Sequence, residues 1–280
     1  MRRREWIMAA LASAGLPLQG DNHKIERAII DSMLPEDLPL VDRFKLAVEV
    51  GFKSMEVRTV ENDADARAIN DAAQAAGLRI HSVMNQTHWR HPLSSPDPAD
   101  VEACVVGVKA SMRQARMYGA NALLLVPAVV RSDTTYEQAW ERSQAEIRKL
   151  IPLAEKHDVI IALEDVWNKF LLTARDFRQY IDDFNHPLIQ AYFDVGNIVH
   201  YAVPEHWIRE LGSRIVKVHL KDYSRRDGFV NLGDGDVDWP AVRESLAAIG
   251  YTAEATVELR GGDRAYLSDL GQRVDRLLGL

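Results

Sequence analysis

Four apolar segments in the second half of the chain each end in an ionisable residue. VIIALE ends at Glu164, IQAYFD at Asp194, RIVKVH at His219 and AEATVE at Glu258. Segments of this composition are typical of buried strands, so a charged terminal residue conflicts with its surroundings and usually marks a site. The intervals between the four residues are 30, 25 and 39 positions, close to the ~30 residues of a strand, a crossover helix and the next strand. This spacing predicts a barrel of repeated βα units whose strands all end on one face.

Strand and helix signals alternate along the rest of the chain. Besides the four strands above, we expect strands at 28–33, 54–58, 79–83 and 121–127. The expected helices are 38–50, 63–76, one around 101–112, 136–157, one opened by Thr173, 238–250 and 267–278. Eight strand signals that alternate with helix signals predict the α/β fold class, as a closed (β/α)8 TIM barrel in a single domain. No GxGxxG motif follows the first strand, which argues against a dinucleotide site.

Composition narrows the classes of partner. With 280 residues and 47% hydrophobic content, the chain is large enough for one barrel domain. The formal net charge is -7 and no long basic run occurs, so nucleic acid is not an expected partner. No apolar run approaches the ~20 residues of a membrane-spanning helix. The single cysteine, Cys104, lies in a helical apolar pattern typical of simple burial. A small polar molecule is the expected partner, and the oligomeric state stays open, a homo-oligomer included.

Residues 1–22 have the form of an export signal that precedes the barrel domain at 23–280. Arg3 and Arg4 are followed by a moderately apolar stretch and by the small residues Ala12-Ser13-Ala14. Paired arginines before such a stretch are typical of the twin-arginine type. The alternative is an N-terminal helical extension on a cytoplasmic enzyme. We favour export to the periplasm over a cytoplasmic location.

The four residues at the strand ends are candidate metal ligands. Because parallel strands of a barrel end on one face, Glu164, Asp194, His219 and Glu258 should converge there. Three carboxylates and one imidazole form an oxygen-rich set suited to a divalent cation. The alternative is that each is an ordinary polar residue at a strand end that faces solvent.

The motifs IALED, FDVGN, KVHLKD, LGDGDVDW and TVEL, in this order, resemble the xylose-isomerase-like barrel superfamily, and within it the sugar phosphate isomerase/epimerase group with its ketose 3-epimerases. The resemblance implies that Glu164, Asp194, His219 and Glu258 bind one divalent ion, commonly manganese, magnesium or cobalt, with zinc as a further candidate. It also implies that Glu164 and Glu258 perform the acid/base chemistry.

The resulting hypothesis is an isomerase that removes a proton next to the carbonyl of a sugar or sugar phosphate, through a metal-stabilised enediolate. One glutamate would take the proton and the other would return one from the opposite face. A lyase or dehydratase acting on a keto-sugar or inosose is the alternative that shares this first step. An abasic-site endonuclease is disfavoured, because that class needs a histidine where this chain has Asn197. A non-catalytic sugar-binding protein is the third alternative.

Several further residues are candidates for substrate contact, each weighed against an ordinary structural role. Glu56 is expected to point into the barrel mouth and bind sugar hydroxyls. Lys221 and Arg225 or Arg226 are expected to neutralise a phosphate. The other candidates are His81, Asn168 and Asn197, with Trp89 and Trp167 as apolar walls. The loop 85–98, which carries Trp89, is expected to cover the site.

Overall fold

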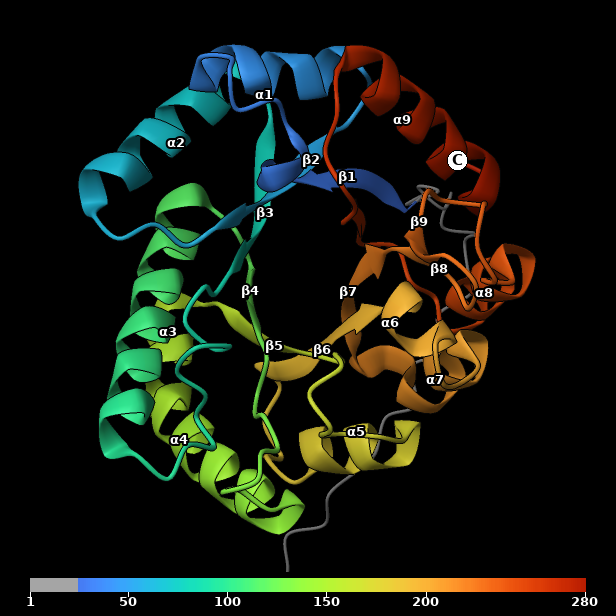
Figure 1. Cartoon of the computed structure of the whole chain (residues 1–280). Helices are drawn as coiled ribbons and strands as arrows, with labels where there is room; N and C mark the ends of the chain where they lie inside the picture. Colours follow the sequence, from blue (N-terminus) through green and yellow to red (C-terminus); the bar gives the residue numbers. More distant parts are fainter. Residues whose placement is uncertain (1–24) are drawn as a thin grey trace, which may run out of the picture.

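The computed structural model describes residues 25–280, in which eight parallel strands close into a barrel. The (β/α)8 TIM barrel predicted from the strand spacing is therefore confirmed (Figure 1). Around the barrel the strands follow the order β1-β10-β7-β6-β5-β4-β3-β2. Their bounds are β1 Glu26–Ile30, β2 Ser54–Arg58, β3 Arg79–Met84, β4 Ala122–Leu125, β5 Ile160–Glu164, β6 Ile189–Asp194, β7 Ile215–Leu220 and β10 Glu254–Val257.

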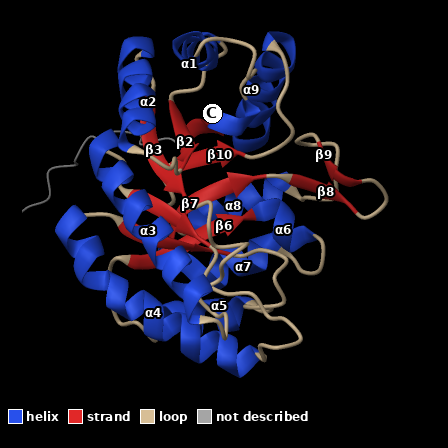
Figure 2. Ribbon diagram, turned by 60° about the vertical axis from the view of Figure 1, so that its left-hand side comes forward, coloured by secondary structure: helices blue, strands red, loops and turns tan. Residues whose placement is uncertain are grey.

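The helices cover the outer face of the barrel, as Figure 2 shows from the side. In chain order they are α1 Leu40–Glu49, α2 Asp63–Ala76, α3 Pro98–Tyr118, α4 Tyr136–His157, α5 Ala174–Asp182, α6 Val195–Val199, α7 Pro204–Leu211, α8 Trp239–Ala248 and α9 Arg264–Leu278. None of these helices combines the length and apolar character needed to cross a bilayer. The predicted leader at 1–22 lies outside the described residues.

Local sequence signals fix many helix ends. At the start of α4, the Thr135 side chain accepts from the backbone of Gln138, and the Gln138 side chain accepts from the backbone of Thr135, which makes a capping box. Helix α2 is followed by Gly77, whose φ of 68° lies in the left-handed region that favours glycine. Such ends explain why the predicted bounds of α2 and α4 agree with the structure.

The structure differs from the expected elements in several places, among them helices α6 and α7, which were not expected. The first strand ends at Ile30 and continues as a 3-10 turn, Asp31–Met33, rather than as strand. Helix α3 starts at a proline capped by Asp97 and is longer than the apolar stripe from which it was inferred. The segment after β7 forms a small antiparallel hairpin, β8 Asp222–Ser224 and β9 Gly228–Val230, too short to show strand periodicity.

The space inside the barrel is partly polar. The main apolar core lies between the sheet and the helices, and a small interior cluster contains Ala122, Leu124, Ala162 and Tyr192. Lys217 and His219 occupy alternate positions of β7 and so point to the same side of the strand, and both are buried. The barrel interior is therefore lined by ionisable groups that must form hydrogen bonds and ion pairs with one another.

Candidate metal centre and active site

The four predicted ligands converge at the carboxyl ends of β5, β6, β7 and β10. Asp194 and His219 are register partners on neighbouring strands, and His219 is in turn the partner of Thr256, two residues before Glu258. Glu164 ends β5, the next strand around the barrel. One ligand atom from each of the four residues lies within 4.8 Å of the others. The sequence-predicted set is thus brought together by strand register alone.

His219 is at the centre of this cluster. Its Nδ1 atom is 3.0 Å from Glu164 Oε1, 2.9 Å from Glu258 Oε2 and 3.7 Å from Asp194 Oδ2. Its Nε2 atom points the other way and lies 3.0 Å from Glu56 Oε1. The imidazole therefore presents one nitrogen to the cluster and anchors the other in the barrel interior, as metal-binding histidines commonly do.

The carboxylates of the cluster stabilise the protonated forms of the basic side chains beside them. Burial by itself lowers the pKa of His219, but the charges of Glu258 and Glu56 outweigh it and raise that pKa well above its ordinary value. Burial also lowers the pKa of Lys221, yet Asp194 and Glu258 raise it overall. The negative charges of the cluster's carboxylates therefore favour a bound cation.

The two candidate catalytic glutamates respond differently to this environment. Burial raises the pKa of Glu164 to about 7. Burial also raises the pKa of Glu258, but the charges of His219 and Lys221 dominate and hold it below its ordinary value. Burial raises the pKa of Asp194 as well. The pKa values of both glutamates are therefore perturbed by burial and by specific charged neighbours, as is typical of functional sites.

The residues fit a divalent cation. Asp194 Oδ2 and Glu258 Oε2 are buried and accept no well-directed hydrogen bond within residues 25–280, although Lys221 Nζ approaches them to 3.0 and 2.7 Å. Three carboxylates and one imidazole match the hard oxygen and nitrogen ligands of manganese, magnesium, cobalt or zinc. Glu164, Asp194, His219 and Glu258 are therefore the residues that could hold such an ion.

The FDVGN motif explains how Asp194 is positioned. Asp194 Oδ1 accepts a hydrogen bond from the backbone of Asn197 at 2.8 Å and thereby caps α6. Gly196 lies so close to Lys221 that a Cβ there would be 2.4 Å from the lysine Cβ. Asp165 accepts from the backbone N–H of Asp194 at 3.0 Å, and burial raises the pKa of its carboxyl well above the ordinary value. Asp165 escaped the sequence reasoning, although it directly follows Glu164 in the IALED motif.

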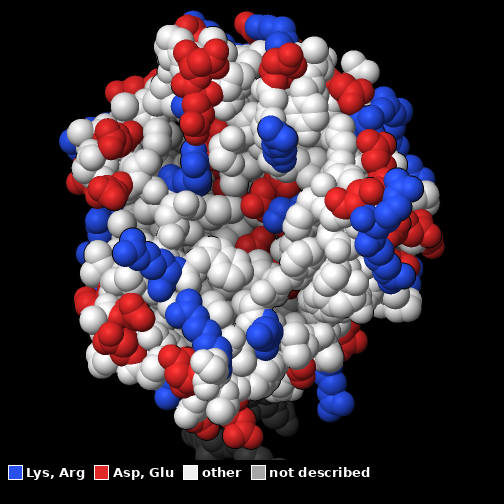
Figure 3. Space-filling model, viewed as in Figure 1, with Lys and Arg blue, Asp and Glu red and all other residues white. Residues whose placement is uncertain are grey.

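An open cavity lies over the cluster. Figure 3 shows acidic side chains gathered in a hollow at the centre of the barrel face, with basic side chains beside them. The volume of this cavity is ≈ 260 Å³, and its lining includes Glu164, Glu258, His88, Trp89 and Trp167. Both tryptophans are half exposed.

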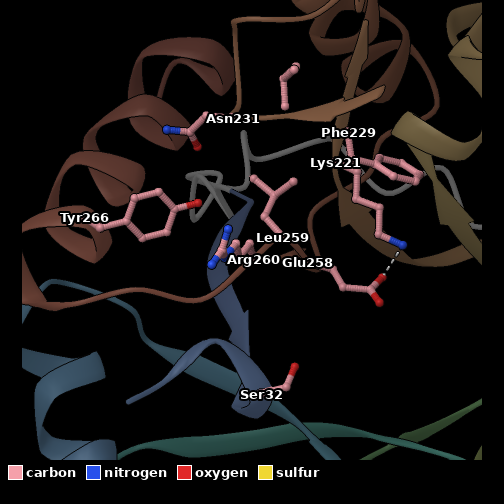
Figure 4. Close-up of a pocket in the computed structure, with 9 residues that line it drawn as sticks. Ser32, Lys221, Phe229, Asn231, Glu258, Leu259, Arg260 and Tyr266 are labelled. Atoms are coloured by element: carbon pink, nitrogen blue, oxygen red, sulfur yellow. Dashed lines mark ion pairs between the residues drawn. The ribbon is translucent and has the colours of Figure 1, made fainter. Parts of the chain in front are cut away.

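A second pocket adjoins the first at Lys221 and Glu258. Its volume is ≈ 440 Å³, and Figure 4 shows its lining residues, with the Lys221–Glu258 ion pair at one side. Arg260 and Tyr266 line the same pocket. Within the described part of the chain, the Arg260 guanidinium forms no ion pair. This pocket offers polar donors next to the carboxylate cluster.

Two of the expected substrate contacts are buried inside the barrel. Glu56 is fully buried and accepts hydrogen bonds from Ser82 Oγ, at 2.5 Å, and from His219. His81 is also fully buried, and its Nε2 lies 3.0 Å from Thr256 Oγ1. Neither residue lines either of the two pockets over the cluster, so their predicted contact with substrate stays a prediction. Glu56 orients His219.

Three more candidates are occupied by contacts of their own. Asn168 is nearly buried and bonds the backbone of Ala128 and Phe170. The side-chain amide of Asn197 donates to the backbone carbonyl of Asp165, although Asn197 also lines the cavity over the cluster. The charge of Lys221 is engaged by Asp194 and Glu258.

The two arginines expected to meet a phosphate lie at the β8–β9 turn and line neither cavity. Arg225 and Arg226 are both exposed. Arg226 pairs with its neighbour Asp227 instead. The hairpin that carries this turn projects from the barrel (Figure 2).

Comparisons with known proteins agree with the barrel fold. A family model described as "Xylose isomerase-like TIM barrel" matches residues 44–274. The chain is 26% identical to L-ribulose-5-phosphate 3-epimerase of Salmonella paratyphi A over 253 residues, which cover 84% of this chain and 87% of the relative. The corresponding epimerase of Salmonella typhi matches with the same identity and coverage.

Solved structures share the fold. A D-tagatose 3-epimerase-like protein superposes with a TM-score of 0.78 at 15% identity, covering 90% of this chain and 98% of that one. D-allulose 3-epimerase from Methylomonas sp., in complex with D-allulose, superposes with a TM-score of 0.75 at 18% identity, covering 91% and 96%. Ketose epimerases are thus built on the same barrel.

Proposed function

Since the chain belongs to the xylose isomerase-like TIM barrel family, we propose that it is a divalent-metal-dependent epimerase of a ketose or ketose phosphate. The observation that carries the proposal is the cluster of Glu164, Asp194, His219 and Glu258 at the barrel mouth, with ligand atoms within 4.8 Å of one another. The epimerase names of the relatives support the same reaction class.

The chemistry is proton transfer at the carbon next to the sugar carbonyl. When bound to these four residues, a divalent ion supplies positive charge that favours an enediolate over the neutral ketose. Glu164 and Glu258 come from strands separated by β6 and β7, so their carboxyls approach the pocket from different sides. One carboxylate removes the proton, and the other carboxyl returns one from the opposite face, which inverts the carbon. Trp89 and Trp167 flank the sugar and limit the access of water.

The second pocket bears on the choice of substrate. A sugar that reaches the cluster with its carbonyl end can extend past Glu258 toward Arg260, two residues further along the chain. A guanidinium without an ion pair among the described residues is suited to a phosphate on the far carbon. This pocket supports a ketose phosphate over a free ketose, with Arg260, which lines it, as the phosphate contact.

The test is incubation of manganese-loaded protein with ketoses and their phosphates in deuterium oxide, followed by NMR. We expect deuterium to replace the proton at carbon 3 and the carbon-3 epimer to accumulate. Glu164→Gln and Glu258→Gln should each slow this exchange by about 10²- to 10⁴-fold, the usual contribution of general acid/base catalysis. Glu61→Gln is the matched control, because Glu61 is exposed and away from the cluster.

Other outcomes identify the alternatives. A keto-sugar or inosose lyase begins with the same proton abstraction, but its product loses a leaving group, which mass spectrometry detects. Sugar binding without deuterium uptake would indicate a non-catalytic binding protein. Full activity in either glutamine variant would remove that glutamate from the proposed mechanism.

A further inference from the structure

His88 is a buried imidazole in the loop between β3 and α3, and the mechanism above does not use it. Only 2% of the residue is exposed, yet the ring lines the cavity over the cluster, together with Glu164 and Glu258. Its neighbour Trp89 meets it edge to face, with ring centroids 5.9 Å apart. The loop therefore places a nitrogen-bearing ring over the two carboxyls that are proposed to move protons.

The hydrogen bonding of His88 fixes its tautomer. The backbone N–H of Val126, the residue that follows β4, donates to His88 Nδ1 at 3.2 Å. A nitrogen that accepts a hydrogen bond carries no proton, so in the neutral ring the proton is on Nε2. Among residues 25–280, Nε2 has no hydrogen-bond partner. The ring thus has a free N–H donor on the side away from β4.

The surrounding loop is held in place by its own hydrogen bonds. Asn85 Oδ1 accepts from both the backbone and the hydroxyl of Thr87, each at 2.7 Å. The backbone N–H of Asn85 donates to the Leu124 carbonyl at 3.1 Å. Because these contacts tie the loop to β4, the imidazole is set in position before any substrate arrives, which is what a preorganised donor requires.

The ring is also uncharged. Burial lowers the pKa of His88 to about 3, although the charge of Glu258 acts in the opposite direction. A neutral imidazole can donate a hydrogen bond to an oxygen without repelling a nearby cation. Such a donor gains strength when the oxygen it faces becomes negatively charged.

We propose that His88 Nε2–H donates a hydrogen bond to an oxygen of the substrate's carbonyl–hydroxyl pair and stabilises the charge that this oxygen acquires as the adjacent carbon loses its proton. The inference rests on the proposed epimerase function. His88 is then a catalytic residue that contacts the substrate and transfers no proton itself.

The kinetic test compares His88→Phe with His91→Gln in the deuterium-exchange assay, using the full metal-loaded chain. Phenylalanine keeps the ring but has no donor, so we expect kcat to fall by about 10²- to 10³-fold, as when one oxyanion donor is removed. The KM and the bound metal content should change little. His91 is the matched control, because it belongs to the same loop but pairs with Asp100 outside the cavity. His88→Gln, which restores an N–H donor, should recover part of the rate.

The structural test needs no substrate. Long-range ¹H–¹⁵N correlation of histidine-labelled wild-type protein distinguishes the two neutral tautomers, and the His88→Phe spectrum identifies the His88 signal. We expect the Nε2–H form.

An Nδ1–H tautomer would overturn the inference, and so would wild-type exchange kinetics in His88→Phe. If His88→Phe does not fold, the His88→Gln spectrum identifies the His88 signal instead, and the tautomer decides the matter. A wild-type protein that exchanges no proton with any ketose would instead refute the proposed function.

Discussion

Glu56 is a buried side chain that contacts a predicted metal ligand, His219, without being one of the four ligands itself. Its carboxylate accepts from Ser82 and faces His219 Nε2, while the Nδ1 atom of that histidine faces the other three ligands. A carboxylate behind a histidine ligand fixes the ring orientation and increases the basicity of the nitrogen that binds the metal. The affinity of the site for a cation should therefore depend on Glu56.

We expect Glu56→Gln to weaken metal binding by about 10- to 100-fold, the usual effect of removing such a partner. Glutamine keeps the shape of the side chain but removes its charge. Competition with a chelator of known affinity measures the change, and Glu61→Gln controls for the loss of one carboxylate elsewhere. Equal metal affinity in Glu56→Gln and wild type would show that Glu56 has no part in the site.

The β8–β9 hairpin contributes Phe229 to the pocket wall, and the buried carboxylate of Asp222 accepts four hydrogen bonds at its base. Phe229 on β9 stacks on Trp167 from the loop after β5, with ring centroids 5.1 Å apart. Asp222, at the start of β8, is fully buried and accepts from four donors, namely the backbone of Tyr223, Gly233 and Val237 and the indole of Trp239. This residue therefore joins the hairpin to the start of α8.

Replacing Asp222 by alanine should leave these donors without their acceptor. Because each buried unpaired donor costs ~1–3 kcal/mol, and relaxation recovers part of that, we expect a loss on the order of 3–5 kcal/mol in the free energy of unfolding. Urea denaturation provides the measurement. Asp227→Ala on the exposed hairpin turn should change stability by less than ~1 kcal/mol. Similar urea midpoints for Asp222→Ala and Asp227→Ala would contradict the stabilising role of Asp222 in the hairpin.

At the scale of the whole molecule, Glu254 forms two ion pairs at the amino end of the barrel, and the pair with Lys217 is buried. Glu254, the first residue of β10, pairs with Lys217 on β7 and, at 2.6 Å, with Arg79 at the start of β3. Burial alone raises the pKa of Glu254, but neighbouring positive charges lower it to about 2. His81 is one of these neighbours only when protonated, and burial keeps its pKa well below the ordinary value. Lys217 and Arg79 are therefore the residues whose positive charges pair with the Glu254 carboxylate.

This pairing predicts a pH dependence of stability. A carboxyl whose pKa is lower in the folded than in the unfolded chain stabilises the fold above pH ~4.5, and this contribution disappears as the pH falls toward 2. At pH 7, Glu254→Gln should cost ~3–5 kcal/mol, because Lys217 loses its buried partner.

The difference in free energy of unfolding between wild type and Glu254→Gln should narrow between pH 5 and about 2. Urea titrations at several pH values measure it. Glu26→Gln, which removes the more exposed partner of Arg79, should cost less than ~1 kcal/mol. A constant difference across this pH range would exclude the pairing as a source of acid sensitivity.

The barrel and its four candidate ligands could be predicted from the sequence, because buried parallel strands are apolar and their terminal charged residues stand out at the spacing of a βα unit. The alternation in KVHLK and EATVE also carried a signal for an ionisable barrel interior. The position of Glu56 depended on tertiary structure, because it follows a register shift in the β2–β3 pairing and meets a histidine 163 residues away. The orientation of His88 likewise depends on tertiary structure, because its Nδ1 accepts a hydrogen bond from the backbone N–H of Val126, the residue after β4. Local patterns specify which residues end each strand, whereas contacts across the closed barrel decide which of them touch.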